Sequence, residues 1–470
     1  MPRLYLSAAH KSSGKTTLSI GLCAAFTQQG LKVQPYKKGP DYIDPLWLTQ
    51  ASQRCACNLD FNTMSNDEIL RVFQQRRAGS DVTIIEGNKG LHDGMSMDGS
   101  DSNAGMAKLL KSPVVLVIDT RGVSRGVAPL LLGYQRFDPE VNIAGVIFNM
   151  AGGERHAAKL RSVAETYTDI PVLGVVNRHK DLELTERHLG LMPSNENHQS
   201  AAIIKSIAQR VADQVDLEAC LTLAKQGKEL PDYPPLPLPD LPNNTVRIGI
   251  CEDRAFSFYY LSDLHALQLA GAELVSINTL EDEGLPKIDG LFIGGGFPET
   301  HMQQLSDNKL LRTAMKQAIE AGLPTYAECG GLMYLSKQLI WNDQSAEMVG
   351  VIPSAVMMYE KPQGRGYVKL VETGAMPWPG DASQSVIGAH EFHYSKLEDL
   401  DELRRRGHFA YTVKRGKGIT GDEDGWVYKN LLASYSHLRD TEQYHWASRF
   451  VGFVKQQSNI RCPANVGVNA

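Results

Sequence analysis

"AAHKSSGKTT", residues 8–17, separates a short apolar segment at 3–8 from a helix expected between about Lys15 and Gln29. The stretch fits the phosphate-loop pattern G-x-x-x-x-G-K-[ST] with one departure, because Ala9 replaces the first glycine. Backbone N–H groups of such a loop, together with the positive end of the helix dipole, bind phosphate oxygens. The strand–loop–helix context therefore predicts a nucleotide-binding domain built on a parallel sheet.

The nucleotide site is expected to include residues of this loop and one acidic strand end. The loop residues that we expect to bind ATP are Ser12, Ser13, Gly14, Lys15, Thr16 and Thr17. Lys15 would neutralise the β- and γ-phosphates, and the Thr16 hydroxyl is suited to Mg²⁺. Glu86 ends the apolar segment 81–87, where ligands gather in open α/β sheets, so it also suits a metal role.

Three further acids follow predicted strands. Asp41 and Asp44 lie in "KKGPDYIDP", residues 37–45, and Asp93 lies in "EGNKGLHDG", residues 86–94. Any one of them alone could be a solvated loop residue. Their joint placement at strand ends favours contacts to substrate or metal.

The chain divides near "PDYPPLPLPDLPNN", 231–244, where six prolines in fourteen residues exclude a helix and favour an extended linker. Apolar segments rich in Val and Ile alternate with helical segments before it, which predicts a parallel sheet covered on both faces. The second half has the same α/β style, with a helix expected from about Phe258 to Leu269, a strand expected over 348–355 and later segments that look antiparallel. We expect an α/β protein with domains at 1–230 and 245–455 and a tail at 456–470.

Cys329 stands in "PTYAECGGLMYLS", residues 324–336, between a predicted strand and a predicted helix. This is the architecture of a nucleophile elbow, with Ala327 in place of the first glycine. Gly330 leaves the thiol uncovered, and free N–H groups at the helix start can hold an oxyanion. The glycines of "IGGGFPE", 293–299, could add another donor. The alternative is a small buried core cysteine.

A thiol nucleophile needs a base from elsewhere in the chain. The best candidate is His437, in "LLASYSHLRD" at 431–440, which ends an apolar segment. His390 and His393 are rivals, and spacing alone does not choose among the three.

Composition limits the function classes. The balance of 48 Lys+Arg against 53 Asp+Glu gives a formal net charge of −5, which suggests neither a nucleic-acid surface nor a basic membrane patch. The apolar segments are too short to span a bilayer, and the N-terminus is not that of a signal peptide. Seven scattered cysteines favour a reducing compartment, so we expect a cytoplasmic protein.

Together these segments resemble the cobyrinic acid a,c-diamide synthase family of glutamine-dependent tetrapyrrole amidases, over about residues 4–455. The matching segments are "GKTT", "KKGPDYIDP", "EGNKGLHDG", "RHLGL" (187–191), "AFSFYY" (255–260), "GGGFPE", "ECGG" and "HEFHYS" (390–395). The resemblance implies a P-loop amidoligase domain followed by a class I glutamine amidotransferase domain. It also implies the substrates L-glutamine and a tetrapyrrole polycarboxylate, with ATP and Mg²⁺ as cofactors.

The resemblance assigns roles to individual residues. Cys329 would attack the glutamine amide, and His437 would raise its nucleophilicity. The residues implied for substrate binding are Lys38, Asp41, Tyr42, Gly295, Gly296 and Gly330, and those implied for Mg²⁺ are Thr16, Asp41 and Glu86. Asp44 and Asp93 would serve the ATP-dependent step. In that step a carboxylate becomes an acyl phosphate, and ammonia displaces the phosphate.

Several alternatives stay open. Asn88, Lys89 and Asn103 depart from the usual style of the family, so siroheme or nickel-sirohydrochlorin could replace the cobyrinate substrate. A regulatory P-loop ATPase of the partitioning type would explain the first half, but it expects a lysine where this chain has His10. A second half that only binds a ligand would leave the Cys329 turn unused. A homodimer is retained as a candidate assembly.

Overall fold

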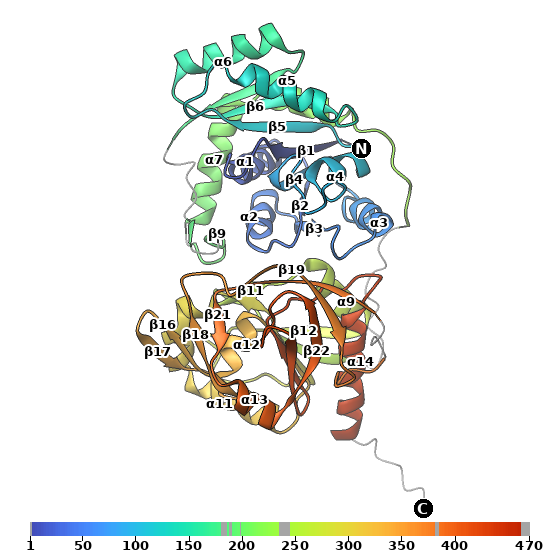
Figure 1. Cartoon of the computed structure of the whole chain (residues 1–470), viewed down its shortest axis with the longest axis vertical. Coiled ribbons are helices and arrows are strands. Elements are labelled where there is room, and N and C mark those ends of the chain that lie inside the picture. Colours follow the sequence, from blue (N-terminus) through green and yellow to red (C-terminus); the bar gives the residue numbers. More distant parts are fainter. Residues whose placement is uncertain are drawn as a thin grey trace, which may run out of the picture. The chain divides into compact units, whose positions relative to one another are not determined.

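The computed structural model describes residues 2–179, 186–187, 190–197, 199–234, 245–380 and 385–461. The chain forms two compact units, Met1–Leu236 and Pro237–Ala470 (Figure 1). The division falls within the proline-rich segment expected to be a linker, of which residues 235–244 lie outside the described part.

Unit 1 contains a seven-stranded sheet in the order β3-β2-β4-β1-β5-β6-β7. Every neighbouring pair is parallel, which confirms the predicted parallel sheet. The strands are β1 (Arg3–Ala8), β2 (Val33–Lys38), β3 (Cys57–Leu59), β4 (Val82–Gly90), β5 (Val114–Asp119), β6 (Ile143–Ala151) and β7 (Val172–Asn177). A short pair, β8 (Glu186–Arg187) and β9 (Gly190–Leu191), lies outside this sheet.

Helices cover both faces of this sheet, because side chains alternate along each strand. Leu4 and Leu6 of β1 pack with one set of helices, whereas Tyr5 packs with the other. The first set is α1 (Lys15–Gln28), α2 (Ile43–Ser52), α7 (Ser200–Gln214) and α8 (Leu217–Ala224). The second set is α3 (Asn66–Arg76), α4 (Asn103–Leu109), α5 (Val127–Phe137) and α6 (Glu154–Tyr167). The central place of β1, between β4 and β5, brings the phosphate loop to the carboxyl ends of the strands.

Unit 2 contains a nine-stranded mixed sheet in the order β12-β10-β13-β15-β24-β23-β22-β19-β20. The first five strands pair in parallel and the others antiparallel, in agreement with the two styles expected from the sequence. They are β10 (Val246–Cys251), β12 (Ala272–Ile277), β13 (Gly290–Ile293), β15 (Thr325–Glu328), β19 (Gly364–Glu372), β20 (Ile387–His393), β22 (His408–Arg415), β23 (Glu423–Tyr428) and β24 (Leu431–Ser434).

Smaller elements complete unit 2. The remaining strands are β11 (Phe256–Phe258), β14 (Gly295–Gly296), β16 (Ser336–Trp341), β17 (Gln344–Glu347), β18 (Ile352–Met358) and β21 (Ser395–Leu397). The helices are α9 (Leu261–Leu269), the 3₁₀ helix η2 (Pro298–His301), α10 (Met302–Asp307), α11 (Lys309–Glu320), α12 (Gly330–Leu335), α13 (Leu400–Arg406) and α14 (Trp446–Arg461).

Three boundaries differ from the sequence-based expectation. The helix expected from Phe258 begins at Leu261, because residues 256–258 pair with β14 instead. The strand expected over 348–355 begins only at Ile352, where pairing with β16 starts. The tail expected from 456 is in part helical, since α14 continues to Arg461.

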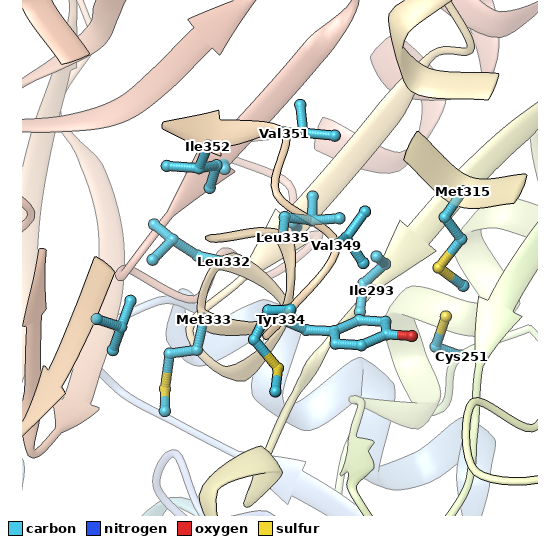
Figure 2. Close-up of a cluster of buried hydrophobic side chains, with 14 of the residues drawn as sticks. Cys251, Ile293, Met315, Leu332, Met333, Tyr334, Leu335, Val349, Val351 and Ile352 are labelled. Carbon is cyan, nitrogen blue, oxygen red and sulfur yellow. The ribbon is translucent and has the colours of Figure 1, made fainter. Parts of the chain in front are cut away.

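The short helix α12 is fixed by the hydrophobic core that packs against its side chains. Figure 2 shows a cluster that includes Ile293, Leu332, Met333, Tyr334, Leu335, Val349, Val351 and Ile352. Leu332, Tyr334 and Leu335 are fully buried, so α12 cannot rotate without exposing apolar surface. This packing holds the turn that carries Cys329. No helix among the described residues is long and apolar enough to span a membrane.

Candidate active sites

The phosphate loop of unit 1 is held in a strained, open conformation. Gly14 precedes α1 with a φ of 81°, and Ser12 also has a positive φ of 63°. The Ser13 hydroxyl donates to the His10 carbonyl at 2.8 Å, and the Asn149 amide donates to the Ser13 carbonyl at 2.9 Å. A Cβ atom at Gly14 would lie 2.1 Å from the Asn149 amide nitrogen. Glycine is therefore required there both by the backbone conformation and by Asn149, which the sequence analysis did not identify.

Lys15 and Thr16 begin α1 and face the carboxylates of the neighbouring strands. Lys15 is buried, and burial, followed by the charge of Lys37, lowers its pKa to about 8. The Thr16 hydroxyl lies 2.7 Å from Glu86 Oε1 and 3.2 Å from Asp44 Oδ2. The expected partners Thr16, Asp44 and Glu86 thus meet, although they come from three elements.

Lys37 is a functional candidate that the sequence analysis missed. Its Nζ is 2.9 Å from Glu86 Oε1, 3.7 Å from Asp41 Oδ2 and in direct contact with Asp44 Oδ2. Burial lowers the pKa of Lys37, but the charges of Asp44 and Glu86 outweigh it and raise the pKa well above its ordinary value. The buried ammonium therefore stays protonated, which compensates the carboxylates that would otherwise repel one another. The only signal in the sequence is its place at the end of β2.

The residues beside Thr16 fit a magnesium ion. Glu86 Oε2 is buried and has no hydrogen-bond partner in the described part of the chain, so one carboxylate oxygen remains for a ligand. Within those residues, no group of three or more His, Cys, Asp or Glu side chains is arranged to hold a metal by itself. Mg²⁺ is usually bound by one or two carboxylates, water and substrate phosphates, and the Glu86 carboxylate and Thr16 hydroxyl are groups of the kind it takes.

The other residues expected near the substrate carboxylate take different positions. Asp41 Oδ1 accepts from the backbone of Ile43 and Asp44 at 3.0 Å, so it caps the start of α2 while its Oδ2 faces Lys37. Tyr42 is the half-buried residue before α2. Asp93 is exposed. Its negative charge partly offsets the lowering of the Lys15 pKa by burial, so Asp93 lies beside the phosphate loop.

Lys38 does not join the cluster around Lys37, because alternate residues of β2 face opposite sides of the sheet. Its ammonium lies 5.8 Å from the ring centroid of Phe61. Burial, more than the opposing charges of Asp60 and Asp101, lowers its pKa to about 8. Lys38 is thus near the site in sequence but on the other face.

Asn103, which departs from the family style, has a structural explanation. Its amide donates to the carbonyls of Asn88 and Gly90 at 3.0 and 2.7 Å, and its carbonyl accepts from the Tyr5 hydroxyl at 2.9 Å. Asn103 is fully buried and fixes the end of β4. Lys89, by contrast, is exposed.

In unit 2, Cys329 sits on a strained turn between β15 and α12. Its φ of 47° and ψ of −99° are unusual for a residue with a side chain, as in a nucleophile elbow. Its backbone N–H donates to the Ser434 carbonyl at 2.8 Å, which ties the turn to the end of β24. The strain is maintained by the surrounding core, and a strained turn of this kind is characteristic of functional sites.

His437 is the histidine that the fold brings to Cys329. Its Nδ1 lies 3.4 Å from Glu328 Oε2, and Cys329 lies close enough to act on the pKa of the imidazole. Burial lowers the pKa of His437, but the interactions with Cys329 and Glu328 outweigh it and raise the pKa to about 10. The imidazole therefore favours the protonated form, which stabilises a thiolate beside it.

The two rival histidines have other positions. The His390 ring stacks on the His437 ring at a centroid distance of 4.8 Å. Burial, and then the charge of His437, lowers the pKa of His390 well below its ordinary value, so it stays neutral. His393 Nδ1 is 2.8 Å from the Ser395 carbonyl, and its ring stacks on Tyr435. His437 is therefore the candidate base by geometry.

The glycine-rich segment lies beside this pair, as expected. A Cβ at Gly330 would lie 2.9 Å from the Gly296 nitrogen, so the two backbones are close together. Gly295 faces the His437 ring, because a Cβ there would be 2.6 Å from His437 Cε1.

Replacing Gly295 with alanine is expected to lower glutaminase activity about 100-fold, because a catalytic group displaced by about 1 Å loses that much. His437 is buried and stacked, so it cannot move aside freely. Glutamate release measures the effect, and ammonia-dependent amidation should be unchanged. The matched control is Gly284→Ala, where a Cβ meets nothing within 4 Å. Equal glutaminase activity in both variants would contradict the packing argument.

Comparisons with known proteins agree with the two sites. Residues 8–191 match the CobQ/CobB/MinD/ParA nucleotide binding domain, and residues 247–443 match the CobB/CobQ-like glutamine amidotransferase domain. The chain is 42% identical over 468 residues to a cobyrinate a,c-diamide synthase of Magnetococcus marinus, covering 98% of this chain and 99% of that protein. The chain belongs to the cobyrinate a,c-diamide synthase family. A synthase of the same name from Methanosarcina acetivorans is 39% identical and covers 93% of this chain and 92% of its own length.

Membership of the cobyrinate a,c-diamide synthase family makes the chain a glutamine-dependent amidating ligase with a nucleotide-binding domain. The alternative of a regulatory ATPase with a non-catalytic second half is set aside, because near full-length relatives carry the synthase name.

In the "RHLGL" segment, Arg187 and Gly190 are backbone partners in the antiparallel β8–β9 pair, and His188 lies outside the described residues.

Proposed function

We propose that the chain amidates the a and c acetate groups of cobyrinate, a sirohydrochlorin-derived tetrapyrrole, with ATP, Mg²⁺ and glutamine. The observation that carries the proposal is the presence of two separate chemical centres. A cysteine–histidine pair stands in unit 2, and a phosphate loop surrounded by carboxylates stands in unit 1. The name of the relatives supports the choice of cobyrinate.

In the glutaminase step, the Cys329 thiolate attacks the carbon of the glutamine side-chain amide. Backbone N–H groups near Gly296 and Gly330 stabilise the oxyanion. His437 gives its proton to the leaving nitrogen, which departs as ammonia, and a thioester remains on Cys329. Water then hydrolyses the thioester to glutamate, with His437 as the base.

In the synthetase step, a substrate carboxylate attacks the γ-phosphate of ATP and becomes an acyl phosphate. Lys15 holds the transferring phosphate, and Asp44 and Asp93 lie beside it. Bound Mg²⁺, held by Thr16, Asp41 and Glu86, would neutralise phosphate charge. Ammonia then attacks the activated carbonyl carbon and phosphate leaves. Phosphorylation is needed because a free carboxylate is a poor acyl donor.

Mass spectrometry of reactions with candidate macrocycles tests this proposal. With ATP and glutamine, cobyrinate should gain two amides, each detected as replacement of a hydroxyl by an amino group. Reactions without ATP are the control. Amidation of siroheme or nickel-sirohydrochlorin, with cobyrinate unchanged, would overturn the substrate and keep the reaction class.

A further inference from the structure

The residue before the nucleophile, Glu328, places its carboxylate on the candidate base. Glu328 ends β15 and is 3% exposed. Its Oε2 lies 3.4 Å from His437 Nδ1. Its Oε1 accepts from the Leu438 backbone at 2.8 Å and from the Tyr326 hydroxyl. One carboxylate thus contacts both the imidazole ring and the backbone next to it.

This arrangement fixes the histidine in two ways. The bond from the Leu438 N–H fixes the backbone that carries His437, and the contact at Nδ1 fixes the ring. A carboxylate at Nδ1 keeps a proton on that nitrogen and leaves the other nitrogen for the thiol. It also stabilises the imidazolium that forms as the thiol ionises.

We propose that Glu328 is the positioning residue of the glutaminase centre, acting on Cys329 through His437. The proposal rests on the roles proposed above for Cys329 and His437. It gives the centre a third member that precedes the nucleophile directly in the chain. Because the two side chains leave opposite faces of an extended strand end, the turn at Cys329 is what lets both reach His437.

The charges around His437 come from several elements. Cys329 and Glu328 come from the end of β15, and His390, which stays neutral, comes from β20. Arg439 follows His437 and its charge acts on His390. Burial, followed by the charge of Asp440, raises the pKa of Asp263 of α9 well above its ordinary value, and the charges of Arg439 and Glu328 also act on it. Glu328 is the carboxylate that faces the imidazole directly.

The sign of the effect follows from these contacts. Glu328 raises the pKa of His437, so the variant Glu328→Gln, which keeps the shape and loses the charge, must lower it. An opposite charge at this distance shifts a pKa by about 1–3 units. The basic limb of the pH profile, where the imidazolium is lost, should therefore move to lower pH by at least about one unit.

The experiment compares full-length variants. Glu328→Gln should reduce kcat for glutamate release about 100-fold to 10,000-fold, the range for loss of a carboxylate that orients a histidine, with little change in KM for glutamine. Glu328→Asp, which keeps the charge, should regain part of kcat and the original basic limb.

Glu372→Gln is the matched control. Glu372 is likewise a buried carboxylate of unit 2 that accepts from a tyrosine hydroxyl, Tyr444, but it pairs with Arg449 instead of a histidine. It should leave the pH profile of glutaminase unchanged. Ammonia-dependent amidation, together with the unfolding midpoint, reports whether each variant is folded.

Two results would overturn the inference. One is a folded Glu328→Gln protein with the kcat and pH profile of the parent. The other, which decides the matter if Glu328→Gln does not fold, is a folded Glu328→Asp protein whose basic limb moves to lower pH by about one unit or more although the charge is kept. Retained glutaminase activity in Cys329→Ala would instead overturn the proposed function of the centre itself.

Discussion

Cys329→Ala is expected to lose glutamine-dependent amidation by at least about 1,000-fold, because no other group can replace the nucleophile in covalent catalysis. With added ammonium salt, the same variant should amidate the tetrapyrrole at the parental rate. The reason is that ammonia enters the synthetase chemistry as a free reactant, and the phosphate loop and its carboxylates lie in unit 1, which contains no part of the Cys329 turn.

The measurement follows glutamate release and amide formation in parallel. Cys55→Ala is the matched control, because Cys55 is a free and exposed thiol of the same chain. An alkylating glutamine analogue should label Cys329 in the parent and in Cys55→Ala but not in Cys329→Ala. Glutamine-dependent amidation that survives in Cys329→Ala would remove this residue from the mechanism.

Lys15→Met is expected to reduce amidation about 100-fold to 1,000-fold with glutamine and with ammonia alike. Lys15 begins α1 at the phosphate loop, and a preorganised donor of this kind typically contributes that much to a charged transition state. The charges of Glu86, Asp44 and Asp93 each raise its pKa against the effect of burial. Glutamate release without ATP should persist, because its residues belong to unit 2.

ADP formation measures the loss of the ATP-dependent step. Fluorescence of a labelled ATP analogue measures the loss of nucleotide binding. Lys32→Met is the matched control, because Lys32 is an exposed lysine of the same unit that directly precedes β2. If Lys15→Met lost glutaminase as strongly as amidation, the assignment of Lys15 to the ATP step alone would be wrong.

Local patterns predicted much of the fold. The helix expected from Lys15 was right to within a residue, because a phosphate loop and a buried apolar helix leave few alternatives. The parallel first half and the antiparallel later strands were also correct. The start of α9 was misjudged, because residues 256–258 have a partner strand far along the chain. Pairing of that kind leaves no local signal.

The candidate sites were predicted unevenly for the same reason. Thr16 was named from the phosphate-loop pattern, and Asp44 and Glu86 were named because each ends or follows a strand. The fold then brings the three together. Lys37 and Lys38 are adjacent in sequence, and the sequence favoured Lys38. The pleat of β2 instead turns Lys37 toward the carboxylates.

The sequence by itself identified the two chemical motifs, since the phosphate loop and the strand–turn–helix around Cys329 are each one contiguous stretch with a local pattern. Spacing alone did not choose His437 over His390, although the family resemblance implied His437, and only the tertiary structure brought Glu328 to the His437 ring. That choice depends on burial and on contacts among the turn after β15, strand β20 and the segment after β24. Cys329 and Phe392, which meet where the turn contacts β20, are more than sixty residues apart in the chain. The free energy of a buried charge is set by such neighbours, and neighbours are fixed only when the chain has folded.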